Sequence, residues 1–138
     1  MPSLTPPRVL FVCVENSCRS QLAEALGRRH GLRTSSAGSR PSGRVNPLAV
    51  AAMAELGYDL TTHQSTSIRE ADRERFDAVV TMGCGDDCPE IPTGLREDWP
   101  IPDPRDGGPE DFRRVRELID RHVAALVRRL APPRAVGA

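Results

Sequence analysis

Short apolar runs alternate along the chain with longer segments whose apolar residues recur every three or four positions. Runs rich in β-branched and aromatic residues predict buried strands over residues 8–13, 32–37 and 76–82, with a shorter one over 95–99. Helical spacing predicts helices over residues 17–30, 47–56 and 109–130. This alternation indicates an α/β fold, a three-layer sandwich in which helices cover both faces of a four-stranded parallel sheet.

The length of 138 residues fits one domain, which we expect over residues 8–130. Residues 1–7 are rich in proline and are expected to form a flexible leader. Residues 131–138 contain two prolines, which cannot continue the preceding helix, so we expect a flexible tail there.

Composition and charge exclude several classes of function. The 19 basic and 19 acidic side chains cancel, which argues against a nucleic-acid partner. Every basic residue is an arginine, which excludes a lysine Schiff base or a phosphate-binding lysine. The apolar runs are too short to span a membrane and the N-terminus lacks a signal-peptide pattern, so we expect a cytoplasmic protein without a membrane partner.

A cysteine, five residues and an arginine stand between the first predicted strand and the first predicted helix. A strand-to-helix turn directs backbone N–H groups into one concavity that suits a tetrahedral oxyanion, and Arg19 can hold two of its oxygens. The same field favours the thiolate of Cys13, to which Ser20 can donate a hydrogen bond. Asn16 can adopt the left-handed conformation that such a loop requires. The alternative is a buried cysteine near an unrelated surface arginine, but the flanking strand and helix favour catalysis.

A second pair of cysteines, Cys84 and Cys88, follows the third predicted strand in a segment rich in Gly and Asp. The pair has three interpretations: a zinc half-site, two inert thiols, or a redox relay in which Cys84 resolves an intermediate on Cys13 and Cys88 then resolves Cys84. No histidine has a zinc-ligand spacing, and a Gly/Asp-rich loop is a poor place to bury inert thiols. A nucleophilic cysteine together with this pair favours the relay.

The segment 9–24, with Cys-x-x-Asn-Ser-Cys-Arg-Ser-Gln-Leu-Ala-Glu, resembles the arsenate reductases built on the low-molecular-weight tyrosine phosphatase fold, the class recycled by thioredoxin. Further matching segments extend the resemblance over residues 8 to 130: 36–38, 45–47, 77–82 and 99–104. Phosphatases of this fold usually have proline after Arg-Ser and tyrosines after their Asp-Pro. This chain has Gln21, then Arg105 and Asp106, at those places.

The resemblance implies a role for each candidate residue. Cys13 would attack arsenic(V), Asp103 would protonate the leaving oxygen, Cys84 would attack Cys13 to expel arsenite, and Cys88 would pass the disulfide to thioredoxin. The oxyanion would bind to the loop residues Val14, Glu15, Asn16, Ser17, Cys18, Arg19 and Ser20. Cys18 has no role in this relay and is interpreted as an inert thiol, and Trp99 as packing for the Asp103 loop.

The chain departs from the family pattern at three places. Glu15 puts a carboxylate in an anion-binding loop, so we expect its side chain to point away. Three residues match the potassium ligands of some relatives (Asn16, Glu24, Ser36), but Thr66 stands where an acidic residue would complete the set, so we expect no dependence on potassium or any cofactor. The spacing of Cys84 and Cys88 is shorter than usual, which calls for a tighter turn.

Three alternatives remain open from the sequence. One is a phosphatase that acts on phosphotyrosine, because arsenate and phosphate are nearly isosteric. Another is an arsenate reductase coupled to mycothiol or glutathione instead of thioredoxin. The third is a non-catalytic sensor in which Cys13 and Cys84 form a regulatory disulfide.

Overall fold

The computed structural model describes residues 5–69, 75–83, 91 and 93–130. Four strands, three α-helices and one 3₁₀-helix follow in the order β1 (Arg8–Cys13), α1 (Arg19–Arg29), β2 (Arg33–Gly38), α2 (Pro47–Ala54), η1 (Leu60–Thr62), β3 (Phe76–Thr81), β4 (Thr93–Asp98) and α3 (Pro109–Leu130). Residues 1–4 of the predicted leader and the predicted tail lie outside the described residues, as do Cys84 and Cys88.

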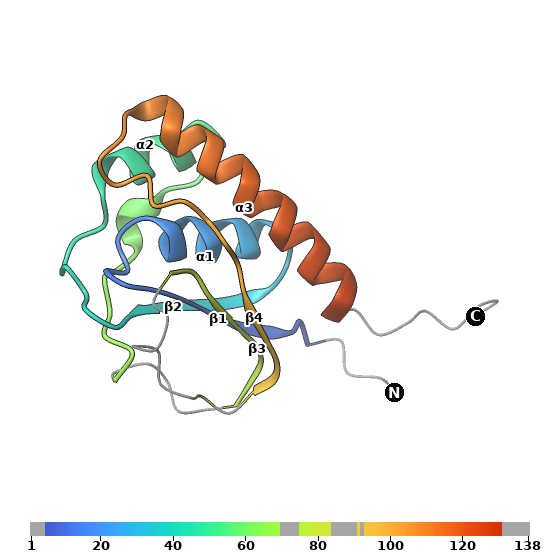
Figure 1. Ribbon diagram of the computed structural model, residues 1–138. Helices are drawn as coiled ribbons and strands as arrows, with labels where there is room; N and C mark the ends of the chain where they lie inside the picture. Colours follow the sequence, from blue (N-terminus) through green and yellow to red (C-terminus); the bar gives the residue numbers. More distant parts are fainter. Residues whose placement is uncertain (1–4, 70–74, 84–90, 92, 131–138) are drawn as a thin grey trace.

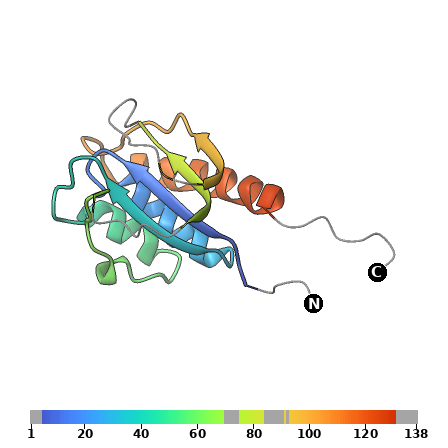
Figure 2. The ribbon, with the colours of Figure 1, turned by 90° about the horizontal axis from the view of Figure 1, so that it is seen from below.

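All four strands are parallel and lie in the order β2-β1-β3-β4 (Figure 2). The prediction of an α/β fold with a four-stranded parallel sheet is therefore confirmed. The chain leaves β1 for β2 on one side and later returns to β3 on the other, so the order reverses between β1 and β3. In open parallel sheets ligands bind beyond the carboxyl ends of the strands at such a reversal. Cys13 is the last residue of β1 and therefore lies at this point.

The described helices all lie on one face of the sheet (Figures 1 and 2). Together with that face they enclose the main core, to which β1 contributes Val9 and Phe11, α1 Leu22 and Leu26, and α3 Phe112. The opposite face carries a smaller cluster, which includes Leu10, Val12 and Phe76, against which Val14, Ile68 and Ile91 pack. The sequence predicts helices on both faces of the sheet, but the described helices lie on one face, where apolar residues of all three pack into a single core.

Most element boundaries agree with the sequence pattern, and the differences have local causes. Helix α1 begins at Arg19, two residues after the predicted start, because the preceding residues form the loop after β1. Strand β4 begins earlier than predicted because its side chains alternate between partly buried and exposed, so its polar residues conceal an edge strand. The 3₁₀-helix Leu60–Thr62 is an addition, and its first turn is capped by the Asp59 carboxylate, which accepts from the Thr61 amide at 3.0 Å.

Within the described residues, no helix is both long and apolar enough to cross a membrane.

Candidate active site

The loop between β1 and α1 is held from outside through its own carbonyl groups. The carbonyl oxygens of Cys13, Val14, Glu15 and Ser17 accept hydrogen bonds from amides of the segment 39–46, at 2.7–3.2 Å. In a trans peptide unit the N–H points opposite to the C=O. The amides that follow these carbonyls therefore face the interior of the loop, where they form a concavity suited to an anion.

Asn16 gives the loop its sharp turn. Its φ is 51°, in the left-handed region that the sequence analysis assigns to it. The side-chain amide of Asn16 donates to Ser20 Oγ at 2.8 Å, and its oxygen accepts from the Thr66 amide at 2.7 Å. The asparagine thus ties the loop to both α1 and the segment after η1.

A glycine at the end of β2 makes room for this loop. A Cβ at Gly38 would lie 2.6 Å from the Val14 oxygen and 2.9 Å from the Asn16 nitrogen, both backbone atoms that cannot easily move. The sequence alone shows a strand that ends in glycine. Only the pairing of β2 with β1, which sets Gly38 opposite Cys13, explains why a side chain cannot be accepted there.

The thiol of Cys13 lies at the floor of the loop and is almost fully buried. Its sulfur lies 2.9 Å from Ser20 Oγ. Ser20 Oγ accepts a hydrogen bond from the side-chain amide of Asn16, so its own hydroxyl group can donate a hydrogen bond to the sulfur. The Ser20 hydroxyl is thus placed to donate to the sulfur of Cys13, the atom that would act as the nucleophile.

Arg19 connects the loop to the segment that carries Asp103. Its guanidinium donates to the Ile101 carbonyl at 3.1 Å and lies 3.6 Å from the Asp103 carboxylate. Gly83, with φ of 83°, lies so close to this guanidinium that a Cβ there would overlap it. Arg19 is therefore fixed in place from two neighbouring strand ends.

A cavity of about 110 Å³ brings the predicted site residues together, and it is lined by Cys13, Val14, Glu15, Ser17, Cys18, Arg19, Asp103 and Arg105. Two further predicted residues, Asn16 in the loop and Ser20 in α1, are fully buried and hydrogen-bonded to each other, which holds the loop in shape. In the ion pair of Arg19 and Asp103, the arginine side chain is buried, whereas 39% of the Asp103 side chain is exposed to solvent. Cys84 and Cys88 lie outside the described residues, so their roles remain predictions.

Glu15, whose side chain is expected to point away from the bound anion, is among the residues that line the cavity, and its carboxylate forms an ion pair of 2.8 Å with Arg105. This contact raises the pKa of Arg105. Arg105 thus compensates the carboxylate that would otherwise repel an anion, and the sequence could not show it because the two residues lie 90 positions apart.

Cys18 is the second thiol of the cavity wall, and it is also buried. Burial raises the pKa of the Cys18 thiol to about 11, while a hydrogen bond with Ser17 acts in the opposite direction. At neutral pH this thiol is protonated and a poor nucleophile. The geometry therefore agrees with its interpretation as an inert group.

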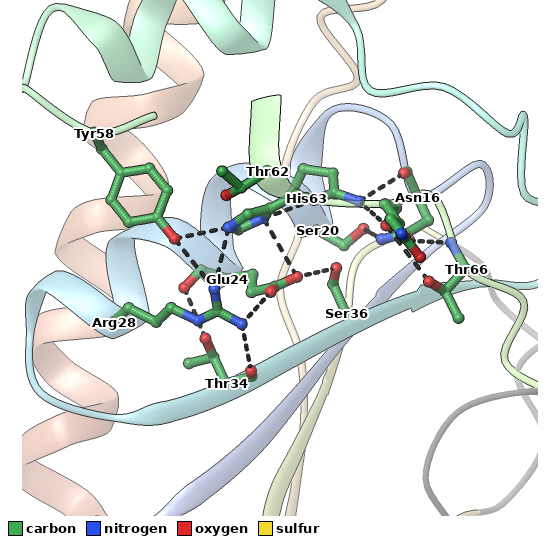
Figure 3. A network of polar contacts seen from close by, with 12 residues as sticks. Asn16, Ser20, Glu24, Arg28, Thr34, Ser36, Tyr58, Thr62, His63 and Thr66 are labelled. Carbon is green, nitrogen blue, oxygen red and sulfur yellow. Dashed lines mark hydrogen bonds and ion pairs between the residues drawn. The ribbon is translucent and has the colours of Figure 1, made fainter. Parts of the chain in front are cut away.

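A polar network runs from the loop along α1, as Figure 3 shows. Glu24 accepts from Ser36 Oγ and forms an ion pair of 2.6 Å with Arg28, and its carboxylate lies 3.6 Å from His63. Burial lowers the pKa of His63, whose ring also lies against Tyr58. The sequence analysis did not single out His63 or Arg28, because a lone histidine in a polar stretch and an arginine on a helix carry no recognisable signal.

This network supports the expectation that potassium has little effect. The Glu24 carboxylate is already neutralised by the Arg28 guanidinium, and the Asn16 side-chain oxygen is already used by the Thr66 amide. Alkylation rates of Cys13 should therefore be nearly the same in sodium and potassium chloride. Sulfate or phosphate should instead slow the alkylation, because each would occupy the loop. A slowing that requires potassium would contradict this account of the network.

Residues 8–135 match the family described as low molecular weight phosphotyrosine protein phosphatase. The chain is 35% identical over 130 residues to a glutaredoxin arsenate reductase of Synechocystis sp., a match that covers 90% of this chain and 98% of that protein. A solved arsenate reductase in the phosphate-binding state is 33% identical, with a TM-score of 0.80 and coverage of 91% and 99%. A thioredoxin-dependent arsenate reductase of Corynebacterium glutamicum is 31% identical, with a TM-score of 0.72 and coverage of 93% and 63%.

A parallel sheet with an anion-binding cysteine loop at the reversal of strand order defines an enzyme of the phosphatase-like α/β class. The chain belongs to the low molecular weight phosphotyrosine protein phosphatase family and, within it, to the arsenate reductases.

Proposed function

We propose that this enzyme reduces arsenate to arsenite through a nucleophilic attack by Cys13 and a relay over Cys84 and Cys88 that thioredoxin recycles. The observation that carries the first step is one cavity in which the Cys13 thiol, the Arg19 guanidinium and the Asp103 carboxyl group converge. A tetrahedral oxyanion fits such a site, because the loop amides and the planar guanidinium offer donors on several sides. The reaction would take place in the cytoplasm, where thiols stay reduced.

In the first step the Cys13 thiolate forms a bond to arsenic(V) while an arsenic–oxygen bond breaks. Asp103 gives a proton to the departing oxygen, which leaves as water. Arsenic remains in the pentavalent state, and its remaining oxygens stay on the loop amides and Arg19. Cys13 and Asp103 line the same cavity, and this supports the assignment of the acid.

Replacement of Asp103 by asparagine should slow the first step by about 10²–10⁴-fold, the usual contribution of a general acid. The asparagine keeps the shape of the side chain, so phosphate should still protect Cys13 from alkylation. Single-turnover release of arsenite measures the step. Asp120→Asn is a matched control, because Asp120 is similarly exposed and pairs with His30 on another surface. A wild-type rate for Asp103→Asn would place the acid elsewhere.

The second step requires a thiol that attacks Cys13. That thiol forms a disulfide with Cys13 as the sulfur–arsenic bond breaks, and the electron pair of this bond reduces arsenic(V) to arsenic(III). Support for Cys84 comes from its neighbour Gly83, which lies against Arg19 at the edge of the cavity. Cys84 is the next residue in the sequence after Gly83.

The third step transfers the disulfide. Cys88 would attack Cys84, which restores the Cys13 thiol and leaves a Cys84–Cys88 disulfide for an external dithiol to reduce. Cys13 is almost fully buried, so a protein reductant could not easily reach it directly. One of the similar enzymes is described as thioredoxin-dependent and another as a glutaredoxin arsenate reductase. The presence of Cys88 beside Cys84 favours a dithiol protein such as thioredoxin as the partner of this enzyme.

The relay is tested with two cysteine variants in the purified enzyme. Cys84→Ser should form no intramolecular disulfide after arsenate is added. Cys88→Ser should release one arsenite per enzyme and then stop with a Cys13–Cys84 disulfide, visible by peptide mass mapping. Repeated turnover of Cys88→Ser with thioredoxin would contradict the three-thiol relay. Turnover of that variant with glutathione or mycothiol alone would assign the enzyme to the small-thiol class.

A further inference from the structure

The ion pair between Glu15 and Arg105 joins the two sides of the active site. Glu15 belongs to the anion-binding loop, and Arg105 follows the segment that carries the proposed acid. The backbone amide of Arg105 donates to the Asp103 carboxylate at 3.0 Å. Arg105 therefore contacts both the Glu15 carboxylate of the loop and the Asp103 carboxylate. The ion pair thus fixes the loop relative to the segment that carries Asp103.

This pair also separates two cavities. The active-site cavity of about 110 Å³ and a neighbouring one of about 280 Å³ share only three lining residues, Glu15, Ser17 and Arg105. The larger cavity is otherwise lined by the segment 42–47, which includes the exposed Arg44 and the apolar Val45 and Pro47. The ion pair is thus part of the boundary between the active-site cavity, which we call the cradle, and a larger cavity that an organic group could occupy.

We propose that the Glu15–Arg105 ion pair is a substrate filter that admits free inorganic oxyanions and excludes phosphate monoesters. This inference rests on the proposed function, because it concerns the same cradle. A free tetrahedral anion ends at its own oxygens and fits within about 110 Å³. A monoester carries an organic group that must continue out of the cradle, and the joined side chains of Glu15 and Arg105 occupy one of the walls it would have to cross.

The charge of the pair explains why the proposed filter does not repel the inorganic anion. A lone carboxylate beside the loop would repel any anion, whereas the pair is neutral overall and leaves the cradle attractive. Both side chains are partly exposed, with 33% of Glu15 and 49% of Arg105 accessible, so water can reach the pair. Arg105 therefore contributes in two ways: it compensates Glu15, and it closes the boundary toward the larger cavity.

Removal of the filter should reveal ester hydrolysis by the same catalytic groups. The Cys13 thiolate would form a sulfur–phosphorus bond as the bond from phosphorus to the ester oxygen breaks, and Asp103 would give its proton to the leaving alcohol. Water would then cleave the sulfur–phosphorus bond, return a proton to Asp103 and release inorganic phosphate. No electrons are transferred, so the reaction needs neither Cys84 nor a reductant.

The experiment uses Glu15→Ala, Arg105→Ala and the double variant of the full chain, with p-nitrophenyl phosphate as the ester. The double variant should raise kcat/KM for this ester by roughly tenfold or more over wild type, the size of effect typical for a changed pocket fit. Arg105→Ala alone should weaken the protection of Cys13 by inorganic phosphate, by roughly tenfold, because it leaves the Glu15 charge uncompensated. Adding Glu15→Ala to that variant should restore the protection.

A control pair is available on another surface. Arg113 and Glu55 form an ion pair of the same length, 2.8 Å, with similar exposure, so Arg113→Ala should change neither the ester rate nor the protection. An ester rate in the double variant that equals wild type, with phosphate protection intact, would overturn the filter. Failure of the wild type to reduce arsenate, with the ester and protection results as expected, would instead overturn the proposed function and leave the filter standing.

Discussion

Replacement of Cys13 by serine is expected to abolish arsenate reduction, to below about 10⁻⁴ of the wild-type rate, as for the loss of other catalytic nucleophiles. The serine hydroxyl stays protonated at neutral pH, so it cannot form the bond to arsenic at a comparable rate. Serine is also a minimal change in size, and the contact with Ser20 can be kept. Arsenite release measured in a single turnover decides the result.

The same variant separates loss of chemistry from loss of the cradle. The loop amides and Arg19 do not depend on the sulfur atom, so Cys13→Ser should still be stabilised by sulfate or phosphate in thermal unfolding. A variant that unfolds early and no longer responds to these anions would show a damaged loop. Arsenate reduction near the wild-type rate would exclude Cys13 as the nucleophile.

The second large effect is expected for Arg19→Lys, with a loss of about 10²–10³-fold in kcat/KM. Lysine keeps the charge but replaces the planar fork by a single ammonium group, which cannot hold two oxygens of the anion side by side. It would also be unable to keep both the Ile101 contact and the position beside Asp103.

The control for that variant is Arg113→Lys, which changes an exposed arginine in an ion pair with Glu55. It should behave like the wild type. If Arg19→Lys retained wild-type kcat/KM and wild-type protection by phosphate, a positive charge alone would suffice and the bidentate role of Arg19 would be wrong.

The local part of the architecture was open to prediction from the sequence. The apolar run that ends at Cys13 and the helical spacing after Arg19 reflect preferences that neighbouring residues determine, and the helix over residues 109–130 has the expected bounds. The left-handed Asn16 could also be predicted, because few residues other than glycine adopt that conformation. The placement of the described helices on one face of the sheet could not be predicted, because the choice of face depends on how the helices pack on one another.

The contacts that complete the site join residues far apart in the chain. Glu15 and Arg105 meet across the cavity, Gly83 lies against Arg19, and Gly38 lies against the loop. These contacts depend on the order of all four strands, β2-β1-β3-β4, which periodicity does not reveal. The ion-pair partner of Glu15 could not be predicted for this reason: it is recognised only in the fold that brings Arg105 to it.

The most direct test of the central claim adds one equivalent of arsenate to the reduced wild-type enzyme without any reductant, then maps its thiols. The account predicts one arsenite per enzyme, a disulfide between Cys84 and Cys88, and a free Cys13 that iodoacetamide can alkylate. Thioredoxin added afterwards should return the enzyme to the fully reduced state. Arsenate left unreduced, or arsenite formed while Cys84 and Cys88 both remain free thiols, would contradict the account.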